Sequence, residues 1–276
     1  LFDYHLGKRL FDTARQSSKA LLEEIGSKSE QTLTRREHIK YALKLLSQDR
    51  QSVFCQNISA LLNSPDIRFH IKYLAINVIG EVETIKVPMR NLIINLINDE
   101  ELSQPFINNA CFGHPQIVEV LSEQDVISEW LNGSDSQIDL AIRLLSSVAG
   151  KAPDVVISEI EPFIGVSEEW NNRCYSALNW NIQDDSEEMF AVRKRLLQLG
   201  CTVNFVDWQE LAKRYPKKTI ELIQIILEDY KEELTELNFE IEKSEKLDKY
   251  LNRKVWREGQ IEDLENISEA LPNDVL

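Results

Sequence analysis

Apolar side chains recur at three- and four-residue intervals along most of this chain, and no other feature constrains its fold as strongly. Two such runs consist of Ile138, Ala141, Leu145 and Val148, and of Ile220, Ile223, Leu227, Tyr230 and Leu234. This spacing places apolar residues on one face of an α-helix. Alternating apolar and polar residues, which would indicate strands, are scarce, and the short β-branched stretch 203–206 is predicted to be a loop. The pattern predicts an all-α fold.

Prolines and glycines fall where helices are expected to begin and end. Four prolines stand just ahead of an apolar run: Pro65, Pro115, Pro153 and Pro216. Proline at the first helical position loses no hydrogen bond, because that amide has no acceptor within the helix. Four glycines stand near the ends of such runs, where a left-handed residue often terminates a helix: Gly80, Gly133, Gly150 and Gly200. These positions indicate helix boundaries rather than strand turns.

Helix starts also recur at a similar interval. Comparable openings fall near Asp66, Glu101, Ser136, Ser167 and Asp207. The steps of about 31 to 40 residues are close to the length of a helix-hairpin repeat. No tetratricopeptide or ankyrin consensus recurs, which leaves repeats in which each helix pair buries its inner face against the next pair. We predict a degenerate helical-repeat (HEAT/armadillo-like) α-solenoid or superhelix, with a compact irregular helical bundle as the alternative.

The domain organisation follows from shifts in composition. The stretch 26–31 is rich in Ser, Lys and Glu and is the best candidate boundary near the N-terminus. We predict an N-terminal helical segment over residues 1–30 that continues an upstream domain, and a helical-repeat domain over residues 31–276. Beyond Glu228 the chain is dense in Glu and Lys with sparse apolar positions, which predicts a solvated helix or pair of helices.

The charge and the cysteines limit the partners and the compartment. Lys and Arg number 31 against 46 Asp and Glu, a net charge of −15. This balance disfavours nucleic acid and anionic membranes as partners, because phosphate is repelled. No apolar run approaches the roughly 20 residues of a membrane span. The cysteines Cys55, Cys111, Cys174 and Cys201 lie far apart, which predicts buried free thiols in a reducing, cytoplasmic environment.

Motifs that carry catalytic or cofactor chemistry are missing from the sequence. It contains neither Gly-x-x-x-x-Gly-Lys-Ser/Thr nor Gly-x-Gly-x-x-Gly, the two common phosphate-binding loops. The four histidines have no partner at metal-binding spacing. The acidic cluster 184–188 fits a helix cap and first turn better than a cation site. We therefore expect no catalytic residue, no cofactor and no metal in this chain.

Four residues are candidates for a protein-binding surface. Trp170 and Trp180 flank Arg173 and Tyr175, and these residue types dominate the binding energy of protein interfaces. The alternative is that these aromatic side chains form the core of this segment. A basic cluster at 193–195 is expected to lie on a solvated helix face.

Two short segments resemble prokaryotic STAND-type signalling NTPases. In that family a Phe-Phe-Asp-Tyr-x-x-Ala-Arg-Arg-Phe-like stretch follows the nucleotide-binding and winged-helix region, and residues 1–10 match it at Phe2, Asp3, Tyr4 and Arg9. Residues 66–74 resemble the first repeat of the family's helical region. The family's nucleotide-binding residues have no counterpart in this chain. The resemblance implies the C-terminal sensor or regulatory arm of a larger ATPase, and several relatives of that kind act in bacterial antiviral defence.

Together these features predict a non-catalytic module that recognises a protein ligand, or an upstream domain of the same parent protein, and signals to an ATPase region. A free-standing helical-repeat scaffold or adaptor is the first alternative. The second is a helical-repeat enzyme, which would need polar groups converging in a pocket.

Overall fold

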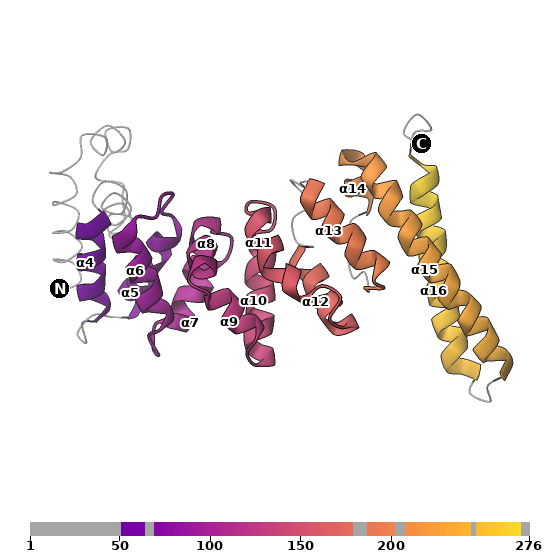
Figure 1. Ribbon diagram of the computed structural model, residues 1–276, viewed down its shortest axis with the longest axis horizontal. Helices are drawn as coiled ribbons and strands as arrows, with labels where there is room; N and C mark the ends of the chain where they lie inside the picture. Colours follow the sequence, from indigo (N-terminus) through magenta and orange to yellow (C-terminus); the bar gives the residue numbers. More distant parts are fainter. Residues whose placement is uncertain (1–50, 64–68, 179–186, 202–207, 244–246, 272–276) are drawn as a thin grey trace. The chain divides into compact units, whose positions relative to one another are not determined.

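A computed structural model of the protein describes residues 51–63, 69–178, 187–201, 208–243 and 247–271 (Figure 1). Every regular element in these ranges is a helix, which confirms the all-α prediction. In chain order the elements are α4 (Gln51–Leu62), α5 (Phe69–Gly80), α6 (Val87–Ile97), α7 (Ser103–Phe106), the π-helical turn η2 (Ile107–Cys111), α8 (Pro115–Glu123), α9 (Val126–Leu131), α10 (Asp135–Val148), α11 (Pro153–Ile160), the 3₁₀ turn η3 (Glu161–Phe163), α12 (Glu168–Leu178), α13 (Glu187–Gln198), α14 (Trp208–Arg214), α15 (Pro216–Lys243) and α16 (Leu247–Glu269).

The chain divides into two compact units, Leu1–Val148 and Ala149–Leu276. The described part of the first unit contains α4 to α10, and that of the second contains α11 to α16. The expected boundary at 26–31 lies outside the described residues, so the division into 1–30 and 31–276 stays a prediction. The loop expected at 203–206 also lies outside them.

Three of the four predicted proline positions and one of the four glycine positions act as predicted, and Pro65 lies outside the described residues. Pro115, Pro153 and Pro216 are the first residues of α8, α11 and α15. Among the described glycines, φ is positive at Gly113, Gly165 and Gly200. Of the four predicted positions, therefore, only Gly200 adopts the left-handed conformation.

The first unit is built by helices that pack on near neighbours in sequence. Helix α4 contacts α5 and α6, α6 contacts α7 and α8, and α8 contacts α9 and α10. The predicted stripe on α10 is buried at all four positions. Large side chains without exposed surface include Phe54, Ile58, Ile76, Ile79, Met89, Ile93, Phe106, Ile117, Leu121 and Ile127. Apolar burial of this kind, at about 25 cal/mol per Å², is the main stabilising contribution.

Two glutamine side chains hold the loop between α5 and α6. Gln51, which is only 5% exposed, accepts the backbone N–H of Lys86 at 2.9 Å and donates to the carbonyl oxygen of Thr84. Gln116 donates to the carbonyl oxygens of Gly80 at 3.1 Å and Val82 at 2.8 Å. Four backbone groups in and beside this loop are therefore hydrogen-bonded by side chains of α4 and α8.

Helix α5 and the turn η2 approach each other closely at Gly80. A Cβ atom at this position would lie 3.0 Å from Nε2 of His114 and 3.1 Å from the carbonyl oxygen of Ala110, which belongs to η2. Glycine is required here by the close approach and not by a left-handed backbone.

In the second unit, α11, α12 and α13 pack on one another, and α15 packs on α13, α14 and α16. Helices α15 and α16 form a long antiparallel hairpin (Figure 1). Ile220, Ile223 and Tyr230 of α15 are buried as their spacing predicts, whereas Leu227 and Leu234 of the same run are half-buried. The guanidinium carbon of Arg257 on α16 lies 3.7 Å from the centroid of the Tyr230 ring, and Arg257 pairs with Glu233. This hairpin is the predicted charged C-terminal helix pair.

No helix in the described part of the chain is both long and apolar enough to cross a membrane.

Candidate protein-binding surface

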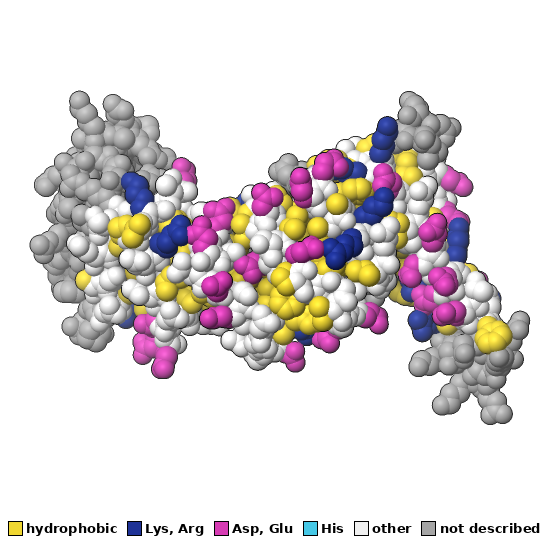
Figure 2. All heavy atoms as spheres, viewed as in Figure 1, with side chains coloured by type: hydrophobic (Ala, Val, Ile, Leu, Met, Phe, Trp, Pro, Cys, Tyr) yellow, Lys and Arg dark blue, Asp and Glu magenta, His cyan; other side chains and the backbone are white. Residues whose placement is uncertain are grey.

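A partly exposed apolar surface lies where the turn after α11 meets the start of α12 and the end of α13. Val166 is 62% exposed and Leu199 is 43% exposed, which are high values for such residues. Leu199 reaches the turn that carries Val166, since its Cδ1 would lie 3.9 Å from a Cβ added at Gly165. Phe163 and Trp170, from the same turn and the start of α12, are half-buried. We call Phe163, Val166, Trp170 and Leu199 the aromatic platform. Figure 2 shows hydrophobic side chains gathered over α12.

The two aromatic rings of the platform stack. The centroids of the Phe163 and Trp170 rings lie 4.2 Å apart with an angle of 24° between the ring planes. The guanidinium carbon of Arg173, one turn further along α12, lies 5.4 Å from the centroid of the Trp170 ring. Arg173 also pairs with Glu169 at 2.7 Å. The Phe163 ring and the Arg173 guanidinium together fix the orientation of the Trp170 indole and leave part of it open to solvent.

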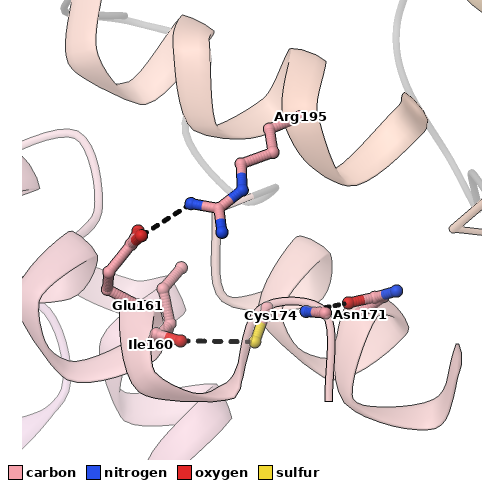
Figure 3. A network of polar contacts seen from close by, with 6 residues as sticks. Ile160, Glu161, Asn171, Cys174 and Arg195 are labelled. Carbon is pink, nitrogen blue, oxygen red and sulfur yellow. Dashed lines mark hydrogen bonds and ion pairs between the residues drawn. The ribbon is translucent and has the colours of Figure 1, made fainter. Parts of the chain in front are cut away.

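The turn that carries Val166 is held by polar contacts from α12. Gly165 has a φ of +86°, in the left-handed region where glycine is favoured. Its N–H donates to Oδ1 of Asn171 at 2.8 Å, and the Asn171 side chain is 5% exposed (Figure 3). Oγ of Ser167 accepts the N–H of Trp170 at 3.1 Å and so caps the start of α12.

Two further contacts tie η3 and the end of α11 to the neighbouring helices (Figure 3). Arg195 of α13 pairs with Glu161 of η3 at 2.6 Å. The thiol of Cys174 on α12 donates to the carbonyl oxygen of Ile160 at 3.7 Å. The platform is thus supported from three helices and is pre-organised, which lowers the entropy cost of binding.

The structure brings together two of the four predicted binding residues. Trp170 and Arg173 form one surface group on α12. Tyr175 is 3% exposed and lies in the core, because its position on α12 falls on the face that also carries buried Cys174 and Leu178. For Tyr175 the alternative of a core role therefore applies. Trp180 lies outside the described residues.

Sequence reasoning missed Phe163, Val166 and Leu199. One signal could have found the first two. The segment 162–166, Pro-Phe-Ile-Gly-Val, links two helical runs but is largely apolar, whereas such connections are usually polar because they lie at the surface. Nothing in the sequence marks Leu199 as exposed, because an apolar residue just before Gly200 is equally consistent with the buried end of a helix.

The basic cluster at 193–195 is not a uniformly solvated face. Arg193 is 3% exposed and donates to the carbonyl oxygen of Leu178. Lys194 is half-buried and pairs with Glu221, and Arg195 is exposed. The expectation was wrong for Arg193 because this residue lies on the face of α13 that packs against α12, where its guanidinium satisfies a carbonyl at the end of that helix.

The four cysteine thiols are buried and unpaired with one another, as predicted; the reducing, cytoplasmic compartment stays a prediction. All four cysteines are free and buried. Burial raises the pKa of Cys55 to about 11 and those of Cys174 and Cys201 to about 12, and it raises the pKa of Cys111 further. These pKa values keep the thiols protonated, whereas a nucleophilic cysteine needs a lowered pKa.

The described residues contain no group of three or more His, Cys, Asp or Glu side chains that could hold a metal ion.

Comparisons with protein-family models, with curated proteins and with solved structures found no match to this chain. Among the described residues the aromatic platform is the strongest candidate site. Its assignment depends on the ring stacking and the exposure of its residues, and not on a relative.

Proposed function

We propose that this chain is a non-catalytic helical-repeat module that binds a protein ligand on the aromatic platform. The observation that carries the proposal is the platform itself: the Phe163 and Trp170 rings stack, and the turn between them carries exposed Val166 and is approached by exposed Leu199. Aromatic anchors held in place before binding are typical of residues that dominate interface energies.

The charges around the platform favour a protein ligand over a phosphate-bearing one. Arg173 is paired with Glu169, and Arg195 is paired with Glu161. Their positive charge is thus balanced within the surface, and the whole chain carries a net charge of −15. We expect the ligand to be held mainly by apolar contacts, so that its affinity changes little with salt.

The finer fold assignment, a HEAT/armadillo-like solenoid, is part of this proposal. Several side-chain hydrogen bonds join residues about one predicted repeat apart. The separations are 35 residues for Gln51 and Lys86, 34 for Gln116 and Val82, 34 for Ser147 and Gly113, and 34 for Arg195 and Glu161. Contacts at a constant interval support a stack in which each repeat is joined to the next.

We further propose that the module is the sensor arm of a STAND-type signalling ATPase in the cytoplasm, with a role in bacterial defence. Support for this comes from the resemblance of residues 1–10 and 66–74 and from the buried free thiols. Ligand would act by binding one arrangement of the parent protein better than another, since without such differential affinity no signal is transmitted.

The binding proposal can be tested by peptide display against the full chain. Particular peptide sequences should be enriched by binding to the wild-type chain. The same sequences should not be enriched on the Trp170→Ala variant. Gln224→Ala, at an exposed position on α15, is the matched control and should retain them. Enrichment that is indifferent to Trp170→Ala, or no enrichment at all, would contradict the proposal.

The link to an ATPase is tested by the native gene. Its coding sequence upstream of Leu1 should contain a phosphate-binding loop followed by a winged-helix region. A coding sequence that begins near Leu1 would remove the ATPase and favour the scaffold or adaptor alternative.

A further inference from the structure

Helix α16 carries apolar residues on two opposite faces. Arg257, Ile261 and Leu264 form its buried face. The exposed apolar residues of α16 are Leu251, Val255 and Trp256, at 36%, 65% and 59%, and Leu251 and Val255 lie one turn apart on the same face. Residues four apart share a helix face, whereas Val255 and Arg257, two apart, lie about 200° apart around the axis. A helix with two apolar faces is expected to be covered on both.

The exposed face of α16 becomes acidic toward the C-terminal end. Beyond Val255, the same face carries Glu258 and Glu262 at steps of three and four residues. Glu269 lies two turns further on, and all three glutamates are exposed. Glu258 lies 3.8 Å from the ammonium nitrogen of Lys254, at the limit of an ion pair. We call Leu251, Val255, Glu258, Glu262 and Glu269 the outer stripe.

We propose that the outer stripe is a docking site for a basic amphipathic helix of another protein. The apolar end of such a helix would cover Leu251 and Val255, and Lys or Arg side chains further along the same face would meet Glu258 and Glu262. Helices that dock in this way present anchors at i, i+3, i+4 and i+7. Leu251, Val255 and Glu258 offer a row of the same kind, at i, i+4 and i+7.

Pairing of the stripe with the same stripe of a second copy of this chain is disfavoured. The outer stripe contains no Lys or Arg, so in either direction of pairing its carboxylates would meet apolar residues or other carboxylates. Like charges at an interface cost binding energy. An anionic membrane surface would be repelled by the same carboxylates. The charge of the stripe therefore favours a cationic partner.

The test uses the full chain and a fluorescent synthetic peptide of about 20 residues, long enough for a helix of about five turns. The peptide carries two leucines at one end and lysines at three- and four-residue steps on the same face. A second peptide has glutamate in place of every lysine. Fluorescence anisotropy should detect binding of the lysine peptide only, with an affinity that falls as salt is raised.

Substitutions in the outer stripe distinguish docking at this site from general attraction of the lysine peptide to a negatively charged protein. Val255→Lys should weaken binding of the lysine peptide at least tenfold, and the double variant Glu258→Gln, Glu262→Gln should weaken it about tenfold and reduce its salt dependence. The matched control Glu228→Gln, Glu232→Gln removes the same charge from exposed positions on α15 and should leave binding unchanged. Val87→Lys, at a 69% exposed position in the first unit, should also leave it unchanged.

Equal weakening by the stripe variants and the α15 control would overturn the proposal, because it would reduce binding to net charge. Absence of lysine-peptide binding would overturn it too. So would sedimentation showing dimers that Val255→Lys dissociates, since the occupant would then be a second copy. Trp170→Ala should leave peptide binding intact, so the outcome at the outer stripe is independent of that at the aromatic platform.

Discussion

The side-chain oxygen of Gln51, at the start of α4, accepts the backbone N–H of Lys86, the residue that caps the start of α6, at 2.9 Å. The two residues are 35 positions apart. Gln116 makes the corresponding contacts from α8 to the beginning of the same loop. The path of the chain between α5 and α6 is thus set by side chains from the helices on either side of it.

Replacing either glutamine should destabilise the protein. Gln51→Ala and Gln116→Ala each remove two hydrogen bonds to backbone groups, at a cost of about 1 kcal/mol per bond. We expect each to lower the free energy of unfolding by about 1 to 3 kcal/mol, measured by urea denaturation. Gln224→Ala, at an exposed position, should change it by less than about 0.5 kcal/mol. Equal effects at the three positions would show that the loop contacts do not contribute to stability.

Two glycines should respond to alanine with opposite signs. Gly80→Ala places a Cβ against a ring atom of His114 and the carbonyl oxygen of Ala110, and overpacking of this kind costs about 1 to 3 kcal/mol. Gly259, within α16, has nothing within 4 Å of the added Cβ. Gly259→Ala should therefore raise the free energy of unfolding by about 0.5 to 1 kcal/mol, the helix preference of alanine over glycine. Thermal denaturation of both variants measures the difference, and stabilisation by Gly80→Ala would disprove the close approach.

The buried thiols should be unreactive in the folded protein. Because Cys55, Cys174 and Cys201 have raised pKa values of about 11 to 12, their thiolate fraction is very small near neutral pH. Ellman's reagent at about pH 8 should label the four cysteines slowly without denaturant and rapidly in urea. Rapid labelling of the native protein would contradict the burial.

The same thiols should make stability depend on alkaline pH. The ordinary thiol pKa is 9.0, whereas that of folded Cys174 is about 12. Above about pH 9 the unfolded chain binds fewer protons than the folded chain, so the free energy of unfolding falls as pH rises. Each thiol contributes a loss of up to about 1.4 kcal/mol per pH unit. In Cys174→Ala the loss between about pH 9 and pH 10, measured by urea denaturation, should be smaller than in the wild type, and an equal loss would contradict the raised pKa.

Alanine substitutions at Trp170 and Tyr175 should have different effects, because the first is a binding residue and the second a core residue in this account. Tyr175 is 3% exposed, and Tyr175→Ala should lower the free energy of unfolding by about 3 to 5 kcal/mol, as for other large core aromatics. Trp170 is half-buried at the surface, so Trp170→Ala should cost about 1 kcal/mol or less in stability. It should nevertheless weaken ligand binding by about 2 kcal/mol, or roughly thirtyfold. Comparable stability losses in the two variants, measured by urea denaturation, would show that Trp170 is also a core residue.

Much of the helical architecture could be predicted from the sequence because it depends on local rules. Proline at positions 115, 153 and 216 opens helices, and the spacing of apolar residues identifies the buried faces of α10 and α15. The predicted starts near Glu101, Ser136 and Ser167 fall within two residues of α7, α10 and α12. These features need no knowledge of the partner helices.

The remainder depends on tertiary contacts that sequence periodicity does not contain. Arg193 is buried because its guanidinium reaches a carbonyl at the end of another helix. Val166 is exposed because Asn171 and the left-handed Gly165 fix the turn that carries it. Trp170 and Tyr175 have similar chemistry and lie five residues apart, yet only the packing of α12 decides which of them reaches the surface.

Site-specific photocrosslinking in the native host tests the binding account most directly. A photoreactive phenylalanine analogue in place of Val166 should give one discrete adduct with a protein ligand, and Trp170→Ala in the same chain should abolish it. The same analogue at exposed Gln224, on α15 and away from the platform residues in sequence, is the control and should give no such adduct. An adduct at position 224 but not at 166, or one that persists with Trp170→Ala, would contradict recognition at the aromatic platform.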